Sequence, residues 1–159
     1  MKSRAGRGVV ASLIGGVLFG IMMQVMTAPT PDGGQVPMLG MVAMLVDSDS
    51  LAVGWIVHLA ISGPFGLIFG WLFGARVTGP GAGLGWGAVY GLIWWVLGGL
   101  LLMPLILGLP AFAPLTMPEM RSVALGSLAG HLLYGLVLGG SYAWLAKRSV
   151  GMELRPQTS

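Results

Sequence analysis

Four long segments without a charged side chain constrain this chain more than any other feature. They cover residues 9–28, 51–75, 83–109 and 122–146. Each is long enough for a helix to cross the hydrocarbon core of a bilayer, which takes about 20 residues. Only 8% of the residues are charged, whereas a soluble domain carries about 25%. We therefore predict an all-α, polytopic transmembrane four-helix bundle that forms a single domain, 1–159.

The segment 9–28 could also be interpreted as a cleaved signal peptide. Its apolar region would be unusually long for that role, and Pro29 would sit badly beside a cleavage site. We therefore expect a retained first span. Two internal prolines, Pro64 and Pro104, predict bends in the second and third spans, because proline removes a helical hydrogen bond.

The connections between the spans have distinct compositions. The first begins with the turn-rich sequence PTPDGG, residues 29–34. The apolar run Val36–Val46 follows, and it is too short to cross a membrane, so we predict a short half-buried or interfacial helix there. Residues 47–50 (DSDS) offer several N-caps for the second span. The third connection is proline-rich, and residues 147–159 form a polar tail that we expect to be cytoplasmic and loosely ordered.

The basic residues predict the orientation, because lysine and arginine gather on the cytoplasmic side of a membrane. The first connection has none and the third has only Arg121. The others lie in the head, the second connection and the tail: Lys2, Arg4, Arg7, Arg76, Lys147, Arg148 and Arg155. We expect a multi-pass protein of the cell inner (plasma) membrane with both termini cytoplasmic. No basic stripe interleaved with aromatics suggests nucleic acid.

The two halves of the chain resemble each other. GGVLFG (Gly15–Gly20) in the first span resembles WGAVYG (Trp86–Gly91) in the third. His58 in the second span and His131 in the fourth are followed by leucine, glycine, aromatic residues and tryptophan at matching offsets. We predict two pseudo-repeated helix pairs, related by an axis along the membrane normal.

His58 and His131 are the candidate functional residues. The two residues lie at similar distances from the outer ends of two spans that run in the same direction. Both are therefore expected about 14 Å below the outer boundary of the membrane. Ionisable groups at this depth usually face the bundle interior. They could hold a b-type haem or help to hold a metal, with Ser62 and Tyr134 as supporting hydrogen-bond partners. Alternatively, each makes a structural hydrogen bond to a backbone carbonyl, Ser62, Ser127 or Tyr134.

A closed metal site lacks further ligands, because the chain has no cysteine and no carboxylate at membrane depth. The absence of an intramembrane carboxylate also leaves no nucleophile–base–acid set, so we do not expect an enzyme. Glycines at helical spacing predict close helix packing. They are Gly66, Gly70, Gly74, Gly87, Gly91, Gly126, Gly130, Gly135 and Gly139.

Two segments carry a family resemblance: GHLLYGLVLGGSYAWL (Gly130–Leu145) and WGAVYGLIWW (Trp86–Trp95). With the proline-rich third connection, they resemble the small four-span YagU-like inner-membrane proteins of bacteria and archaea. The last helix of that family has a similar His-Leu-x-Tyr/Phe-Gly motif. The resemblance covers mainly the second half of the chain, and it implies the membrane location and the topology but no catalytic residues.

Three functional hypotheses follow from the sequence. The first is a non-catalytic accessory, assembly or scaffolding subunit that packs in the lipid bilayer against other membrane subunits or as a homo-oligomer. The second is a small haem- or metal-binding electron-transfer subunit that uses His58 and His131. The third is a small transporter or an oligomeric pore.

Overall fold

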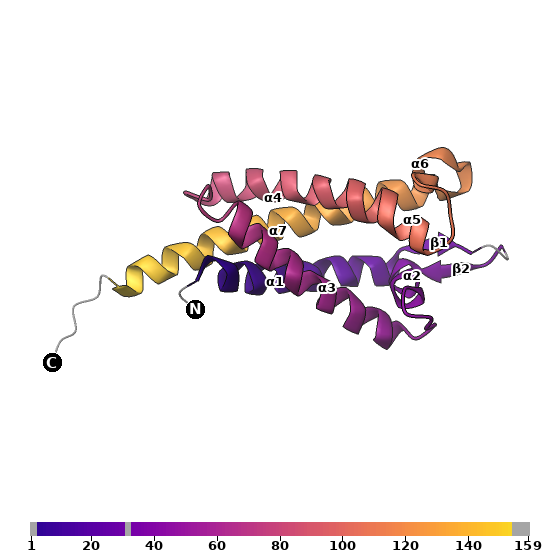
Figure 1. Ribbon diagram of the computed structural model, residues 1–159, viewed down its shortest axis with the longest axis horizontal. Helices are drawn as coiled ribbons and strands as arrows, with labels where there is room; N and C mark the ends of the chain where they lie inside the picture. Colours follow the sequence, from indigo (N-terminus) through magenta and orange to yellow (C-terminus); the bar gives the residue numbers. More distant parts are fainter. Residues whose placement is uncertain (1–2, 31–32, 154–159) are drawn as a thin grey trace.

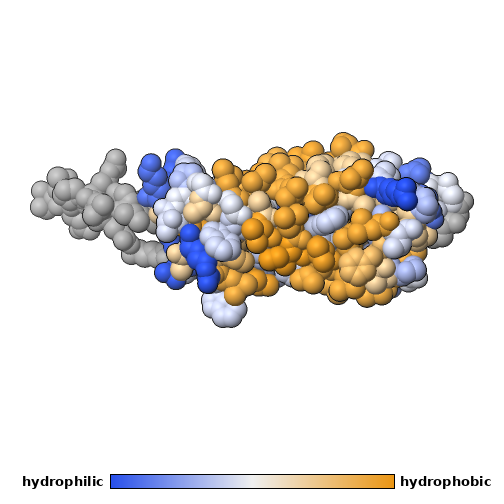
Figure 2. Space-filling model, turned by 90° about the horizontal axis from the view of Figure 1, so that it is seen from above, coloured by the Kyte–Doolittle hydropathy of each residue, from blue (hydrophilic) through white to orange (hydrophobic). Residues whose placement is uncertain are grey.

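The computed structural model describes residues 3–30 and 33–153, with side chains placed as far as residue 148. Four helices within these ranges are long and apolar enough to cross a membrane: Arg4–Val25, Leu51–Leu72, Pro80–Ile106 and Pro118–Arg148. The predicted all-α fold is confirmed, and the chain is a multi-pass membrane protein. Figure 2 shows the corresponding apolar belt, with hydrophilic residues gathered toward the two ends of the molecule.

The elements are named in chain order in Figure 1. The first half contains α1 (Arg4–Val25), β1 (Thr27–Pro29), β2 (Gln35–Pro37), α2 (Met38–Met44) and α3 (Leu51–Leu72). The second half contains α4 (Pro80–Trp94), η1 (Trp95–Leu102), α5 (Met103–Ile106), α6 (Ala113–Thr116), η2 (Pro118–Met120) and α7 (Arg121–Glu153). The start of α1 and the end of α7 lie at the same end of the molecule (Figure 1).

The first span is shorter at its far end than predicted. Its helix ends at Val25 instead of residue 28, and β1 pairs antiparallel with β2, with Ala28 opposite Val36. Pro29 favours this earlier end, because it has no N–H to donate to the carbonyl of Val25. The predicted turn lies between the two strands, where Gly33 has φ +83°, a conformation that favours glycine.

The short helix α2 is more fully buried within the protein than the half-buried or interfacial helix predicted for Val36–Val46. Six consecutive residues from Met38 to Ala43 are shielded. Its Leu39 carbonyl lies so close to α3 that a Cβ on Gly54 would overlap it. A short run that is apolar on all sides suits burial on every face, and here it forms a wedge between the ends of α1 and α3.

Two further helix ends differ from the predicted spans. α3 remains helical through Pro64 and ends at Leu72 rather than residue 75. α7 continues past residue 146 to Glu153, so the first part of the predicted tail is helical, and residues 154–159 lie outside the described ranges.

The third span changes its helical form before Pro104. Residues Trp95–Leu102 form a π-helix, in which the N–H of Met103 reaches back to the carbonyl of Gly98. Pro104 has no N–H for the carbonyl of Leu100. That carbonyl instead accepts a hydrogen bond from the N–H of Phe112 at 2.7 Å. The wide turn and this loop contact allow the helix to continue through the proline to Ile106.

Glycine contacts join α1 to α3 and α4 to α7. A Cβ on Gly87 would overlap the carbonyl oxygen of Gly135, and one on Gly66 would overlap the carbonyl of Gly8. All nine glycines singled out from the sequence lie where a Cβ would overlap a neighbouring atom. Only residues without side chains allow backbones to approach this closely.

Aromatic side chains fill the contact between α3 and α4. Phe65 stacks on Trp94 with ring centroids 3.7 Å apart. Toward the end of the bundle where the chain termini lie, Phe69 contacts Tyr90 and Phe73 contacts Trp86. We call this layer the aromatic seam, and it consists of Phe65, Phe69, Phe73, Trp86, Tyr90 and Trp94. The hydroxyl of Tyr90 also donates to the carbonyl of Phe65 at 2.6 Å. Thus α3 and α4 are held apart by rings rather than brought together by glycines.

Candidate functional site: an intramembrane cavity

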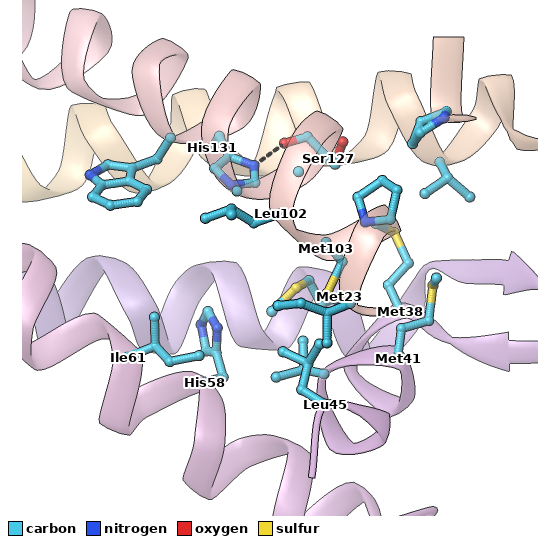
Figure 3. Close-up of a pocket in the computed structure, with 18 of the residues that line it drawn as sticks. Met23, Met38, Met41, Leu45, His58, Ile61, Leu102, Met103, Ser127 and His131 are labelled. Carbon is cyan, nitrogen blue, oxygen red and sulfur yellow. Dashed lines mark hydrogen bonds between the residues drawn. The ribbon is translucent and has the colours of Figure 1, made fainter. Parts of the chain in front are cut away.

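A cavity of about 260 Å³ begins where the aromatic seam ends. Its walls come mainly from α1, α2, α3, η1, α5 and α7, with Trp94 of α4, Pro114 of α6 and Met120 of η2, and almost all of its lining is apolar. We call it the methionine cavity, because five methionines line it: Met23, Met38, Met41, Met103 and Met120. Figure 3 shows Met23 of α1, Met38 and Met41 of α2 and Met103 of α5 around the cavity. Methionine is flexible and polarizable, so such a wall adapts to the shape of an occupant.

One side of the methionine cavity faces the membrane. Three of its lining residues, on α3, η1 and α5, are exposed on the surface of the bundle: Ile61 (37%), Leu102 (48%) and Ile106 (62%). All three lie within helices that are long and apolar enough to cross the bilayer. The opening between α3 and η1 is therefore a lateral mouth toward the acyl chains.

Both histidines contribute to the wall of this cavity. His58 Nε2 donates to the carbonyl of Gly16 on α1 at 2.9 Å, and His131 Nδ1 donates to the carbonyl of Ser127 at 2.7 Å. His58 therefore bridges two helices, whereas His131 is fixed within its own helix. Figure 3 shows them on opposite walls of the cavity, His58 from α3 and His131 from α7.

The two supporting residues chosen from the sequence do not bond the imidazole rings. Ser62 donates to the backbone carbonyl of His58 at 2.8 Å. Tyr134 lies 2.6 Å from the hydroxyl of Ser12, which in turn donates to the carbonyl of Ser62. These bonds tie α1, α3 and α7 together beside the cavity. The roles of Ser12 and Gly16 were not predicted, because neither residue type distinguishes a hydrogen-bond partner from a packing residue.

The ring of Phe19 lies against both histidines, so the site differs from the predicted haem clamp. The Phe19 ring contacts both imidazoles, with centroids 5.6 Å from His58 and 4.9 Å from His131. Gly130 leaves the space for this ring, since a Cβ there would overlap it. A flat macrocycle shared by both histidines would have to displace Phe19. Among the described residues, no group of three or more histidines, cysteines or carboxylates could hold a metal ion.

No family model, curated protein or solved structure matches this chain. The resemblance to YagU-like proteins therefore stays a prediction. The functional argument rests on the residues of the cavity itself.

Proposed function

We propose that this protein binds a lipophilic molecule, without transforming it, in the methionine cavity. The observation that carries the proposal is a buried apolar cavity whose mouth opens between membrane-spanning helices. Ligand sites in proteins are mostly apolar, with a few polar groups that orient the occupant. Here those polar groups are His58, Ser62, Ser127 and His131.

The size of the cavity limits the occupant. At about 260 Å³ it is close to the lower end of small-molecule sites, which begin at about 300 Å³. A ring system or a short stretch of one acyl chain fits this volume, whereas a whole phospholipid does not. Access from the lipid suits a molecule that already partitions into the membrane. The described cavity wall contains no carboxylate, which favours binding over acid–base catalysis.

We further propose a location in the cell inner membrane with both termini in the cytoplasm. Arg4, Arg7, Arg76, Lys147 and Arg148 belong to the end of the bundle that contains both ends of the described chain. The acidic residues Asp47, Asp49 and Glu119 lie in the connections at the other end. This asymmetry follows the usual bias of basic residues toward the cytoplasm. The methionine cavity would then occupy the outer half of the membrane.

Equivalent contacts support the predicted repeat of helix pairs. Ser12 packs on Gly66 as Gly83 packs on Gly139, and Gly16 packs on Ser62 as Gly87 packs on Gly135. Each pair of contacts joins the first helix of one unit to the second helix of the same unit. The offsets are the same 71 and 73 residues by which the sequence halves align. We infer a duplicated two-helix unit in which only the second half has acquired the π-helical segment.

The binding proposal can be tested by photolabelling the full chain in lipid nanodiscs with a short alkyl diazirine. We expect labelled peptides from α2 and from η1–α5, and loss of this label when unlabelled octanol is added in excess. Gly98→Leu should remove the label, because Gly98 lines the cavity and a Cβ there has no neighbour closer than His131 Nε2 at 4.0 Å, so the longer side chain would occupy the cavity. Gly85→Leu is the matched control, since a Cβ there meets nothing within 4 Å.

Labelling spread over the lipid-facing surface, and unchanged in Gly98→Leu, would contradict the proposal. The accessory-subunit, haem and transporter hypotheses remain predictions. Partner capture, a visible absorbance spectrum and vesicle uptake would test them in that order.

A further inference from the structure

We infer that the occupant of the methionine cavity carries a hydroxyl or another hydrogen-bond donor. The inference rests on the binding function proposed above and adds the chemical class of the ligand. It follows from which polar atoms of the wall have already donated their hydrogens. A buried polar group of a ligand needs a partner of the opposite kind, because leaving it unpaired in an apolar site is costly.

The hydroxyl hydrogens of the wall are already used within the protein. Ser62 donates to the carbonyl of His58, and Ser127 donates to the carbonyl of Ala124 at 3.1 Å. Ser12 gives its only hydrogen to the carbonyl of Ser62, so the bond between Ser12 and Tyr134 must use the hydrogen of Tyr134. None of these hydroxyls has a hydrogen left for an occupant.

The hydrogen bonds of the two histidines also determine which ring nitrogen carries the hydrogen. A backbone carbonyl can only accept, so His58 Nε2 and His131 Nδ1 carry the ring hydrogens. In a neutral imidazole the second nitrogen is then an acceptor. For His131 this is Nε2, which lies 4.0 Å from the position of a Cβ on Gly98 in the cavity wall and makes no hydrogen bond within the described residues. Its lone pair is the clearest vacant polar position in the wall.

The indole N–H groups of the two tryptophans do not provide a donor for an occupant either. Trp95 Nε1 donates to the hydroxyl of Ser127 at 3.1 Å. Trp94 Nε1 has no hydrogen-bond partner among the described residues, but it is buried beside Tyr90 with almost no accessible surface, so an occupant of the cavity does not reach it. The described wall therefore offers acceptors and no accessible donor. An alcohol, a phenol or a protonated acid can satisfy it, whereas a ketone or an ether finds no donor.

The test compares two probes of nearly equal shape, 4-hexylphenol and 4-hexylanisole, as competitors of the diazirine label in nanodiscs. Their partition into protein-free nanodiscs is measured separately, so that competition is compared at equal membrane concentration. We expect the phenol to compete about fivefold more effectively, the value of one net hydrogen bond. The unaltered protein suffices for this comparison, so the result does not depend on the folding of a variant.

Two variants assign the preference to one atom. His131→Leu should bring the phenol and the anisole to equal potency, because it removes the vacant nitrogen while keeping the wall apolar. His131→Gln should restore part of the preference, since the amide oxygen can accept near the position of Nε2. A preference for the phenol that persists in His131→Leu would overturn the assignment to His131.

The outcomes separate this inference from the proposed function. Equal competition by both probes in the unaltered protein would overturn the donor requirement and leave the binding cavity standing. Failure of both probes and of octanol to compete would overturn the binding function itself. A stronger effect of the anisole would show that the wall presents a donor, contrary to the hydrogen-bond assignments above.

Discussion

The contact between α3 and α4 has two halves that are built in opposite ways. In the half near the chain termini, the aromatic seam fills the space between the helices, and Phe69 at its centre is fully buried. In the other half, α3 and the continuation of the third span, η1, border the methionine cavity, whose mouth residues are exposed. Helices that lack glycine contacts need large side chains between them, so the interface opens where the aromatics end.

The π-helical segment accounts for the open half. From Trp95 onward the third span follows a wider turn, and Gly98 and Gly99 contribute no side chains to fill the space opposite His131. The loop bond from Phe112 to Leu100 holds this geometry in place. π-Helical segments often occur at functional sites. The comparison suggests that one half provides stability and the other provides space for an occupant. Five predictions test it, three on stability and then two on binding, and each group runs from the largest expected effect to the smallest.

The glycine contacts should tolerate the least change. Gly87→Ala should destabilise the fold by about 3 kcal/mol, because its Cβ would overlap a backbone carbonyl that cannot turn away. The measurement is unfolding by SDS in mixed micelles, followed by circular dichroism. Gly85→Ala, on the open side of the same helix, should change stability by less than about 0.5 kcal/mol. Equal losses in the two variants would show that α4 and α7 are not packed at Gly87.

The two halves should respond differently to truncation of a large side chain. Phe69→Ala should cost about 2 kcal/mol, because it leaves a void among three aromatic rings within a membrane. Met103→Ala should cost less than about 1 kcal/mol, because it only enlarges a space that already exists. Both are measured by SDS unfolding. A larger loss for Met103→Ala would mean that the cavity is tightly packed in solution.

Two buried tyrosines form a matched pair. Tyr134→Phe should destabilise the protein by about 0.6 kcal/mol, because it removes the hydrogen bond to Ser12. Tyr142→Phe should be neutral or slightly stabilising, since the buried hydroxyl of Tyr142 has no partner among the described residues. Thermal unfolding in detergent can rank the two, and the opposite order would refute the hydrogen-bond assignment.

The binding predictions complete the series, because they concern occupancy rather than stability. Gly98→Leu should abolish cavity labelling and leave SDS unfolding within about 0.5 kcal/mol of the unaltered protein. The about fivefold preference for 4-hexylphenol over 4-hexylanisole is the smaller of the two binding effects. Together they test whether the open half is a ligand-binding site or only a packing defect.

Much of this architecture could be predicted from the sequence, because uncharged length determines which segments can cross a membrane. His58 and His131, singled out from the sequence, both lie in the wall of one cavity. The burial of α2 could not be predicted, because a short apolar run suits an interface and an interior equally well. The π-helix escaped prediction because the partner of Leu100 is Phe112, in a loop whose path the local sequence does not determine.

The candidate site shows the same limit. Histidine and serine can be chosen as candidate site residues from their chemical type alone. Their roles, however, depend on the partner and the direction of each hydrogen bond, which the sequence does not give. Ser62 and Tyr134 were expected to support the imidazoles, and instead they bond a backbone carbonyl and Ser12. Phe65, Phe69 and Phe73 recur every four residues, as do Trp86, Tyr90 and Trp94. This matched spacing is a signal from which the aromatic seam could have been predicted.

The central claim is that lipid-soluble molecules occupy the space between α3 and η1. A structure determined in nanodiscs formed from native membrane lipids tests it most directly. We predict density in the methionine cavity that passes between Ile61 and Leu102 into the acyl-chain layer. Direct packing of Ile61 against Leu102, with the cavity closed and no density behind them, would contradict the account.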